Sequence, residues 1–442
     1  MSGSSLRELG MDLAAENQWE KALGVFAEAV RRQPADHRSR MLAARAFEKL
    51  SEPERAVTTL HACAEGLLRR DYLLSAIAAC KQALTLSPNE KRLKETLHRI
   101  HARAAKTVAG KASVPPPLPP QELFDGKVQE DLMSLQGAAL SDAAINVLAA
   151  PDTGGTADSE ARPPLPLFAD LERDAFVELV SCMAYREVPP GEVISGEGQG
   201  GDTIFVIVAG KSEVTRQIDG QPKTLAFLGG GSIFGELAML TGAPLTATVT
   251  TVSETDLFEI RRLDLNQIAR SHPSVPQTLT AFAQNRMAKN LMATSPLFQQ
   301  VPEADRARVL TRFLFKAVQA NEKALTEGEH PSGLFLVLAG ELVVQKEDPA
   351  GGMVSLGILR EGDIAGEISL LTGLRATATV LATRKTAAAF LERNAFHELV
   401  KEFPQVKTYL EGLSERRLKM IGEALRPAEI LDADELVVEG QG

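Results

Sequence analysis

Cysteine and aromatic residues are scarce in this sequence. Its 442 residues include 3 Cys, 1 Trp and 3 Tyr, and the cysteines, Cys63, Cys80 and Cys182, are far apart. So few cysteines at such spacings argue against a disulfide framework and a zinc site. Cys63 and Cys80 lie in apolar helical patterns, and we expect all three cysteines to be buried small residues.

Long apolar runs are missing as well. The N-terminus, Met-Ser-Gly-Ser-Ser-Leu-Arg-Glu, lacks the apolar centre of a signal peptide. No segment approaches the roughly 18 apolar residues of a membrane span. The net charge of −10 combines +6 over residues 1–111, with 19 Lys or Arg and 13 Asp or Glu, and −16 over the rest. We therefore predict a cytoplasmic protein with no membrane or nucleic-acid partner.

Motifs of the common enzyme classes are absent too. The sequence has no Walker loop, no Gly-x-Ser-x-Gly elbow, no kinase signature and no cluster of metal ligands. His98 and His101 have an i, i+3 spacing but lack a third ligand nearby, so no metal or cofactor is predicted. We expect a protein without enzymatic activity.

What the sequence does contain is a long-period repeat. Residues 231–249 and 362–380 align without gaps at an offset of 131 residues. Gly235-Glu236 matches Gly366-Glu367, and both copies end in Thr-Ala-Thr-Val. A repeat of this length indicates one folding unit used twice. Each copy is typical of a loop that runs into a short helix.

Residues 1–108 show helical periodicity instead. Apolar residues recur at helical spacing from Leu6 to Val30, and Pro34 ends the run. Weaker copies follow in residues 43–63 and 76–88. The pattern resembles the tetratricopeptide repeat family over about 90 residues, which implies paired helices that hold a peptide or a partner protein. The alternative is a helical bundle that only packs on its neighbour or self-associates.

Residues 109–163 form the predicted linker. Val-Pro-Pro-Pro-Leu-Pro-Pro at 114–120 favours an extended chain, and a second group of helix breakers lies near its end. Residues 122–135 and 142–149 can form short amphipathic helices. We expect a spacer that leaves the helical part free to move. The alternative, that Gln121–Leu135 docks back as an autoinhibitory segment, lacks an Arg-Arg-x-Ser-like site to support it.

The repeated unit fills residues 164–293 and again 294–425. Each copy opens with an amphipathic helix, from Leu165 and from Pro296, and continues with short alternating strands typical of an all-β sandwich or barrel. The clearest strands are residues 204–210 and 334–340. The predicted closing helices are residues 262–270, 276–291, 392–401 and 406–424.

The order of these elements resembles the cyclic nucleotide-binding domain of catabolite activator proteins and kinase regulatory subunits. The matching motifs are a Glu-Gly-x-x-Gly-Asp turn at 197–202, a Phe-Val-Ile strand, the Phe-Gly-Glu-Leu-Ala cassette and an Ala-Thr-Val strand. The resemblance implies two eight-stranded β jelly rolls with flanking helices, after an all-α repeat domain. It also implies cAMP or cGMP as the ligand, held by backbone N–H groups of each cassette.

By this resemblance, Glu236 and Glu367 accept a hydrogen bond from the ribose 2′-hydroxyl, and Thr246 and Thr377 can reach the base. The candidate ligand-binding residues are Gly235, Glu236, Leu237, Ala238, Leu245 and Thr246 in the first copy, and Gly366, Glu367, Ile368, Ser369, Arg375, Ala376 and Thr377 in the second.

Both copies depart from the family pattern at the arginine that neutralises the cyclic phosphate. Leu245 stands at that position in the first copy and Ala376 in the second, where Arg375 comes one residue early. Adjacent side chains of an extended strand point to opposite faces, so Arg375 should turn away from the pocket. The second copy also replaces the Gly-Gly-Asp of the turn at 200–202 with His-Pro-Ser at 330–332.

Three functions therefore stay open. The first is a regulatory protein that senses a cyclic nucleotide with weakened affinity and alters what its helical repeats hold. The second is a ligand-independent scaffold with degenerate pockets, and the third is a sensor of a different ligand. Residues 426–442 are expected to be an acidic tail, although Glu439-Gly440-Gln441 repeats the start of the turn at 197 and allows a third domain. The oligomeric state is open as well.

Overall fold

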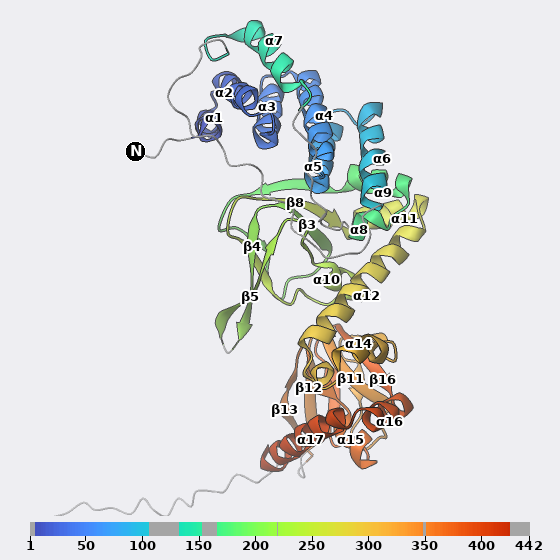
Figure 1. Cartoon of the computed structure of the whole chain (residues 1–442). Coiled ribbons are helices and arrows are strands. Elements are labelled where there is room, and N and C mark those ends of the chain that lie inside the picture. Colours follow the sequence, from blue (N-terminus) through green and yellow to red (C-terminus); the bar gives the residue numbers. More distant parts are fainter. Residues whose placement is uncertain (1–4, 106–131, 153–165, 219, 348–350, 425–442) are drawn as a thin grey trace, which may run out of the picture. The chain divides into compact units, whose positions relative to one another are not determined.

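The computed structural model of the chain describes residues 5–105, 132–152, 166–218, 220–347 and 351–424. Contacts between residues group the chain into two units, whose helices and strands are labelled in Figure 1. The first comprises Met1–Leu240 and Ala247–Ala283, and the second comprises Thr241–Thr246 and Gln284–Gly442. The first unit holds the helical repeats and domain A, the first β domain. The second holds domain B.

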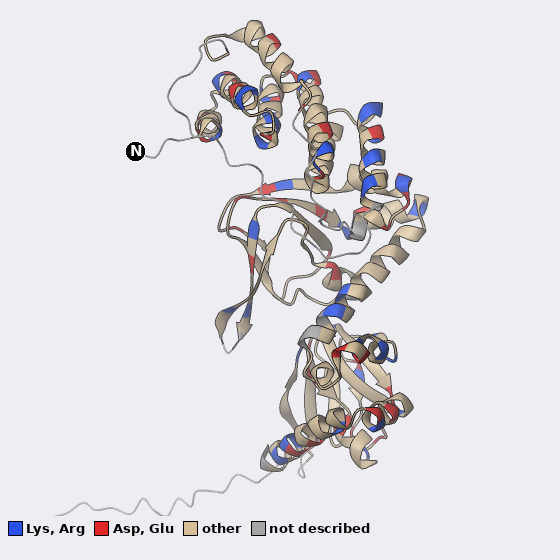
Figure 2. Cartoon of the chain, viewed as in Figure 1, with Lys and Arg blue, Asp and Glu red and all other residues tan. Residues whose placement is uncertain are grey.

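The N-terminal part consists of three antiparallel helix pairs, as the periodicity predicts. They are α1 (Leu6–Ala15), α2 (Trp19–Arg32), α3 (His37–Lys49), α4 (Pro53–Arg69), α5 (Leu73–Leu86) and α6 (Lys91–Ala105). A capping box between Ser5 and Glu8 starts α1, and Pro53 opens α4 at the position where a missing N–H costs nothing. Figure 2 shows Lys and Arg interspersed with Asp and Glu along these helices, typical of a solvated helical surface.

Small residues allow the paired helices to approach closely. A Cβ on Gly10 would come within 2.4 Å of the Phe26 ring, so α1 and α2 need glycine there. Cys63 and Cys80 are fully buried in the same core, as predicted. Cys182 is only half-buried, because it lies at the last position of helix α9 (Arg173–Cys182), and the prediction of full burial was wrong for it.

Part of the predicted spacer packs against the repeats. Residues 137–148 form helix α7 (Gly137–Leu148), which buries Leu140, Ala144 and Leu148 and lies along α2. Arg70 then pairs with the buried Asp152 at 2.6 Å. This part of the spacer is therefore fixed to the helical domain. Most of Gln121–Leu135, and the acidic tail at 426–442, lie outside the described residues.

Each β domain has eight strands in its described residues, in two four-stranded antiparallel sheets, which confirms the jelly roll. The sheet orders are β1-β8-β3-β6 and β2-β7-β4-β5 in domain A, and β9-β16-β11-β14 and β10-β15-β12-β13 in domain B. The two domains thus share one topology. The strands are β1 (Ala184–Val188), β2 (Val193–Ser195), β3 (Thr203–Ala209), β4 (Lys211–Ile218), β5 (Gln221–Gly229), β6 (Ile233–Phe234), β7 (Thr248–Thr251), β8 (Thr255–Arg261), β9 (Leu314–Val318), β10 (Lys323–Leu325), β11 (Gly333–Ala339), β12 (Leu342–Glu347), β13 (Met353–Leu359), β14 (Ile364–Ala365), β15 (Thr379–Ala382) and β16 (Thr386–Glu392).

Helices flank these sheets where the sequence predicts them, with one difference. The single leading helix expected in each copy is two short helices, because Glu172 and Pro302 have extended backbones that interrupt it. The helices are α8 (Pro166–Ala169), α9, α10 (Glu236–Thr241), α11 (Arg262–Ser271), α12 (Ser274–Thr294), α13 (Pro296–Gln299), α14 (Glu303–Leu310), α15 (Glu367–Thr372), α16 (Arg393–Glu402) and α17 (Pro404–Ala424).

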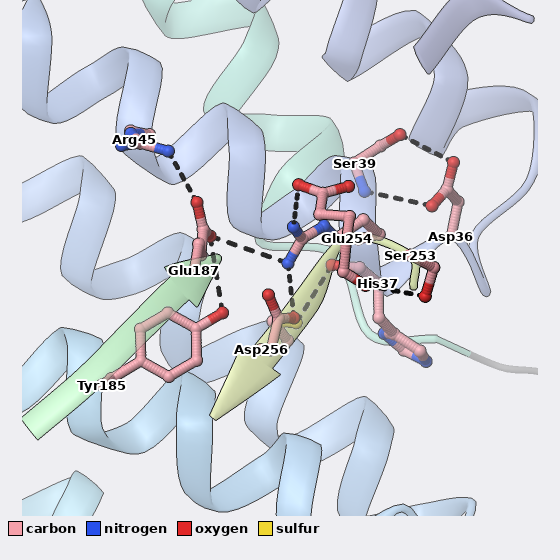
Figure 3. A network of polar contacts seen from close by, with 11 residues as sticks. Asp36, His37, Ser39, Arg45, Tyr185, Glu187, Ser253, Glu254 and Asp256 are labelled. Carbon is pink, nitrogen blue, oxygen red and sulfur yellow. Dashed lines mark hydrogen bonds and ion pairs between the residues drawn. The ribbon is translucent and has the colours of Figure 1, made fainter. Parts of the chain in front are cut away.

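Within the first unit, the helical repeats pack on domain A through a shared apolar core and through polar contacts (Figure 3). The guanidinium of Arg38 on α3 donates to Asp256 at 2.6 Å and to Glu254 at 2.8 Å, and it lies 3.6 Å from Glu187 on β1. Further along, Lys81 donates to the backbone oxygen of Ser181 at 2.6 Å. The expectation that the helical part moves freely was therefore wrong for this unit.

Candidate functional site

The two cassettes begin with glycines that the backbone requires. Gly235 has φ 84° and Gly366 has φ 97°, both in the left-handed region that favours glycine. A Cβ on Gly366 would lie 2.9 Å from the Gly333 oxygen of β11, and one on Gly235 would lie 2.4 Å from the Thr203 oxygen of β3. The sharp turn thus brings each cassette helix, α10 or α15, against its central strand.

Domain B has a cavity of about 240 Å³ beside its cassette. Strand and cassette residues form most of its wall, and α17 contributes the rest. The lining residues are Leu325, Val344, Leu356, Gly357, Ile358, Leu359, Asp363, Ala365, Gly366, Glu367, Ile368, Ser369, Ala376, Thr377, Ala378, Val380, Arg417, Met420 and Ile421. The cavity is therefore mainly apolar, with a few charged groups at the cassette.

Six of the seven candidate residues of the second copy line this cavity: Gly366, Glu367, Ile368, Ser369, Ala376 and Thr377. The seventh, Arg375, does not line it. Its Nη1 donates to the Gly328 oxygen at 2.8 Å, and its side chain is exposed. The buried Ala376 stands where the family has its arginine. The cassette itself thus brings no cation to the cavity.

A cation reaches the cavity from α17 instead. Glu367 is 2% exposed, and the guanidinium of Arg417 donates to its Oε1 at 2.7 Å. The same nitrogen donates to the Ile364 oxygen at 2.6 Å. Sequence reasoning missed Arg417. The signal was available, because Arg286 lies 131 residues earlier, the same offset that relates Glu236 to Glu367.

Four of the six candidate residues of the first copy, at positions 235–238, belong to the first unit. Glu236, buried at 5% exposure, lines a cavity of about 150 Å³ with Met239 and Arg262. Gly235, Leu237 and Ala238 belong to the cassette turn and α10 but do not line it. Leu245 and Thr246 fall in the segment 241–246, which belongs to the second unit.

The turn before the central strand makes different contacts in the two copies. In domain A a Cβ on Gly201 would lie 2.0 Å from the Ala238 side chain, so α10 requires glycine there. Asp202 then pairs with Arg262 at 2.8 Å. In domain B, Arg393 binds the Pro331 oxygen at 2.6 Å instead. The second turn thus replaces a carboxylate contact with a backbone contact.

Comparisons with known proteins match both β domains to one family. Residues 185–272 and 315–403 match the family described as cyclic nucleotide-binding domain. A cAMP-dependent protein kinase regulatory subunit of Blastocladiella emersonii is 28% identical over 236 residues, 53% of this chain and 56% of that protein. The chain thus spans little more than half the length of this relative.

Two solved structures are also similar. The regulatory domain of Toxoplasma gondii PKA with cAMP is 24% identical, with 57% of this chain and 92% of that chain covered and a TM-score of 0.28. The regulatory subunit of a cAMP-independent protein kinase A from Trypanosoma brucei is 19% identical, with 59% and 92% covered and a TM-score of 0.30.

Two segments of this chain, residues 185–272 and 315–403, thus match the cyclic nucleotide-binding domain, and an all-helical region precedes them. Among its described residues, no helix is long and apolar enough to cross a membrane. Within the same ranges, no group of three or more His, Cys, Asp or Glu side chains is arranged to hold a metal ion.

Proposed function

We propose that the chain is a non-catalytic regulatory protein that senses a cyclic nucleotide, cAMP or cGMP, through its tandem domains. The observation that carries this proposal is the domain B cavity, which gathers the cassette around Glu367. Similar proteins are described as regulatory subunits of a cAMP-dependent protein kinase, which supports the proposal. Glu367 accepts the ribose 2′-hydroxyl, and Thr377 faces the base.

The absence of the cassette arginine makes this binding weak. A charge-assisted hydrogen bond is worth about 1.5–3 kcal/mol, so losing it lowers affinity about 10- to 100-fold. Ligand binding matters to the rest of the chain because α17 packs on α15 and β13. A nucleotide that has different affinities for two positions of α17 shifts the population of those positions.

The helical repeats, residues 1–108, are the proposed site for a protein partner. In the first unit these helices are joined to domain A by the Arg38 contacts. A partner held on the repeats is therefore coupled to domain A in our proposal. The domain boundaries at 163, 293 and 425, the tetratricopeptide assignment and the cytoplasmic location remain predictions.

Two alternatives have specific support. Leu245 and Ala376, where the family has arginine, favour a scaffold without ligand. The charge balance in domain B favours a less charged ligand, because Arg417 is already paired with Glu367 and Asp363 adds a second carboxylate to the cavity. A nucleoside without phosphate suits such a cavity better than an anion does.

A thermal-shift titration of the full chain with cAMP and cGMP tests the proposal. We expect a concentration-dependent rise in Tm in the high micromolar to millimolar range. Glu367→Ala should reduce the shift, and Glu415→Ala on the exposed face of α17 should not. If neither nucleotide shifts Tm at millimolar concentration, only the ligand-independent scaffold and the sensor of a different ligand remain. A shift of Tm with adenosine would then favour the sensor, and no shift would favour the scaffold.

A further inference from the structure

The domain B cavity needs a positive group if it is to hold a cyclic phosphate. The cassette supplies none, because Ala376 is buried at the expected place and Arg375 donates to the Gly328 oxygen outside the cavity. In the described part of domain B, Arg417 is the only Lys or Arg that lines the cavity. It is also 22% exposed, so a ligand can reach it.

The hydrogen bonds of Arg417 leave part of its guanidinium available. Nη1 uses its two hydrogens on the Ile364 oxygen and on Glu367 Oε1. Both hydrogen bonds that Arg417 makes to described residues use Nη1. Nη2 and Nε make none to those residues. A guanidinium has five N–H donors in a planar fork. Three donors therefore remain on a side chain that is already held in place.

The sequence repeat supports a role for this arginine beyond one helix. Arg417 follows Glu367 by 50 residues, and Arg286 follows Glu236 by the same interval. Both copies thus lack an arginine at the family's cassette position, and both have an arginine at the same place in the closing helix. Fork-shaped Arg contacts are the favoured way to bind phosphate oxygens.

We propose that Arg417 is the phosphate-binding residue of domain B, in place of the missing cassette arginine. Nη1 keeps Glu367 oriented for the ribose, while Nη2 and Nε bind the exocyclic oxygens of the cyclic phosphate. Asp363 also lines the cavity, but its carboxylate accepts the backbone N–H of Arg360 at 2.8 Å. This inference rests on the proposed function, since it assigns a residue to the same cavity.

The test is calorimetry on the full chain, with Glu236→Ala in every variant so that only domain B reports. Arg417→Ala should weaken cAMP binding about 10- to 100-fold and change adenosine binding less than about threefold, since adenosine has no phosphate. It should also reduce the salt dependence of the cAMP Kd. Arg416→Ala, an exposed neighbour on α17, should change neither. Arg417→Lys keeps the charge without the fork and should give an intermediate loss.

The outcomes separate this proposal from the proposed function. If the Glu236→Ala chain binds cAMP and Arg417→Ala binds it equally well, Arg417 does not hold the phosphate, although the cyclic nucleotide function stands. Equal losses for cAMP and adenosine, with unchanged salt dependence, would reduce Arg417 to a structural partner of Glu367. If Arg417→Ala fails to fold, Arg417→Lys provides the test. The same two measurements then apply: the loss of cAMP affinity relative to adenosine affinity, and the salt dependence of the cAMP Kd. Absence of cAMP binding to domain B overturns both proposals.

Discussion

Replacing Arg38 with alanine should loosen the helical repeats from domain A and destabilise the first unit. The Arg38 side chain is 15% exposed, and the side chain of Asp256 is 11% exposed. Removing one partner of such a buried pair leaves the other charge uncompensated, which costs about 3–5 kcal/mol. Asp256 Oδ1 has no hydrogen-bond partner within the described residues, so the loss of Arg38 leaves that carboxylate poorly satisfied.

The ability of Asp256 to take up a proton limits this cost. Burial raises the pKa of Asp256 to about 6, although Arg38 acts to lower it. Without Arg38 this pKa rises further, and the carboxyl becomes neutral near pH 7. We therefore expect a loss at the low end of the range, about 3 kcal/mol, and a fall in Tm of about 6–12 °C.

Arg45 provides the matched control. It lies on the same helix and pairs with Glu187 at 2.8 Å, but its side chain is 51% exposed. An exposed ion pair contributes about 0–1 kcal/mol, so Arg45→Ala should shift Tm by no more than a few degrees. Thermal unfolding followed by circular dichroism measures both variants. Equal effects of the two substitutions, or no effect of Arg38→Ala, would refute this reasoning.

The stability lost in Arg38→Ala should also depend on pH, in a direction set by the pKa of Asp256. Because the folded pKa of Asp256 lies above its ordinary value of 3.8, the stability that its protonation contributes is complete below pH 3.8 and is lost as the pH rises through 6. His37 acts in the opposite direction, since burial lowers its pKa to about 4. Comparing Arg38→Ala with the parent removes the His37 contribution. Their difference in Tm should shrink from pH 8 to pH 5, and Asp256→Asn should partly rescue Arg38→Ala at pH 8.

Three further predictions concern other parts of the chain. Leu245→Arg should restore the cassette charge of domain A and tighten cAMP binding about 10- to 100-fold by calorimetry; unchanged affinity would argue against a nucleotide site there. Gly366→Ala should lower stability by about 1–3 kcal/mol in thermal unfolding, and more than Gly362→Ala, whose added Cβ meets no atom within 4 Å. Arg70→Ala should remove the 2.6 Å ion pair to Asp152, whose side chain is 2% exposed, and increase hydrogen exchange in residues 132–152, while equal exchange would show that the other contacts of this segment hold it.

Local patterns were enough to predict most of the fold. The strands at 204–210 and 334–340 and the closing helices lie within a few residues of their predicted bounds, because alternation and helical periodicity are properties of short segments. The orientation of Arg375, away from the cavity, agrees with the one-residue shift in the cassette. The eight-stranded jelly roll was implied by the resemblance to the cyclic nucleotide-binding domain and not by these local patterns.

Contacts between distant segments were not predictable in this way. Arg38 and Asp256 are 218 residues apart, and no local pattern marks either as one of a pair. The docking of α7 on α2 was hidden by the proline-rich segment before it, which suggested a free spacer. Arg417 could have been predicted from the sequence, because the 131-residue offset of the cassettes also relates it to Arg286 in the first closing helix.

The proposed function depends most directly on whether domain B binds a cyclic nucleotide. Isothermal titration of cAMP into the full chain carrying Glu236→Ala measures this without a contribution from Glu236. We predict one site per chain, with a Kd in the high micromolar to millimolar range, that Glu367→Ala removes. Absence of heat at millimolar cAMP, or binding that Glu367→Ala leaves unchanged, would contradict the assignment of this cavity.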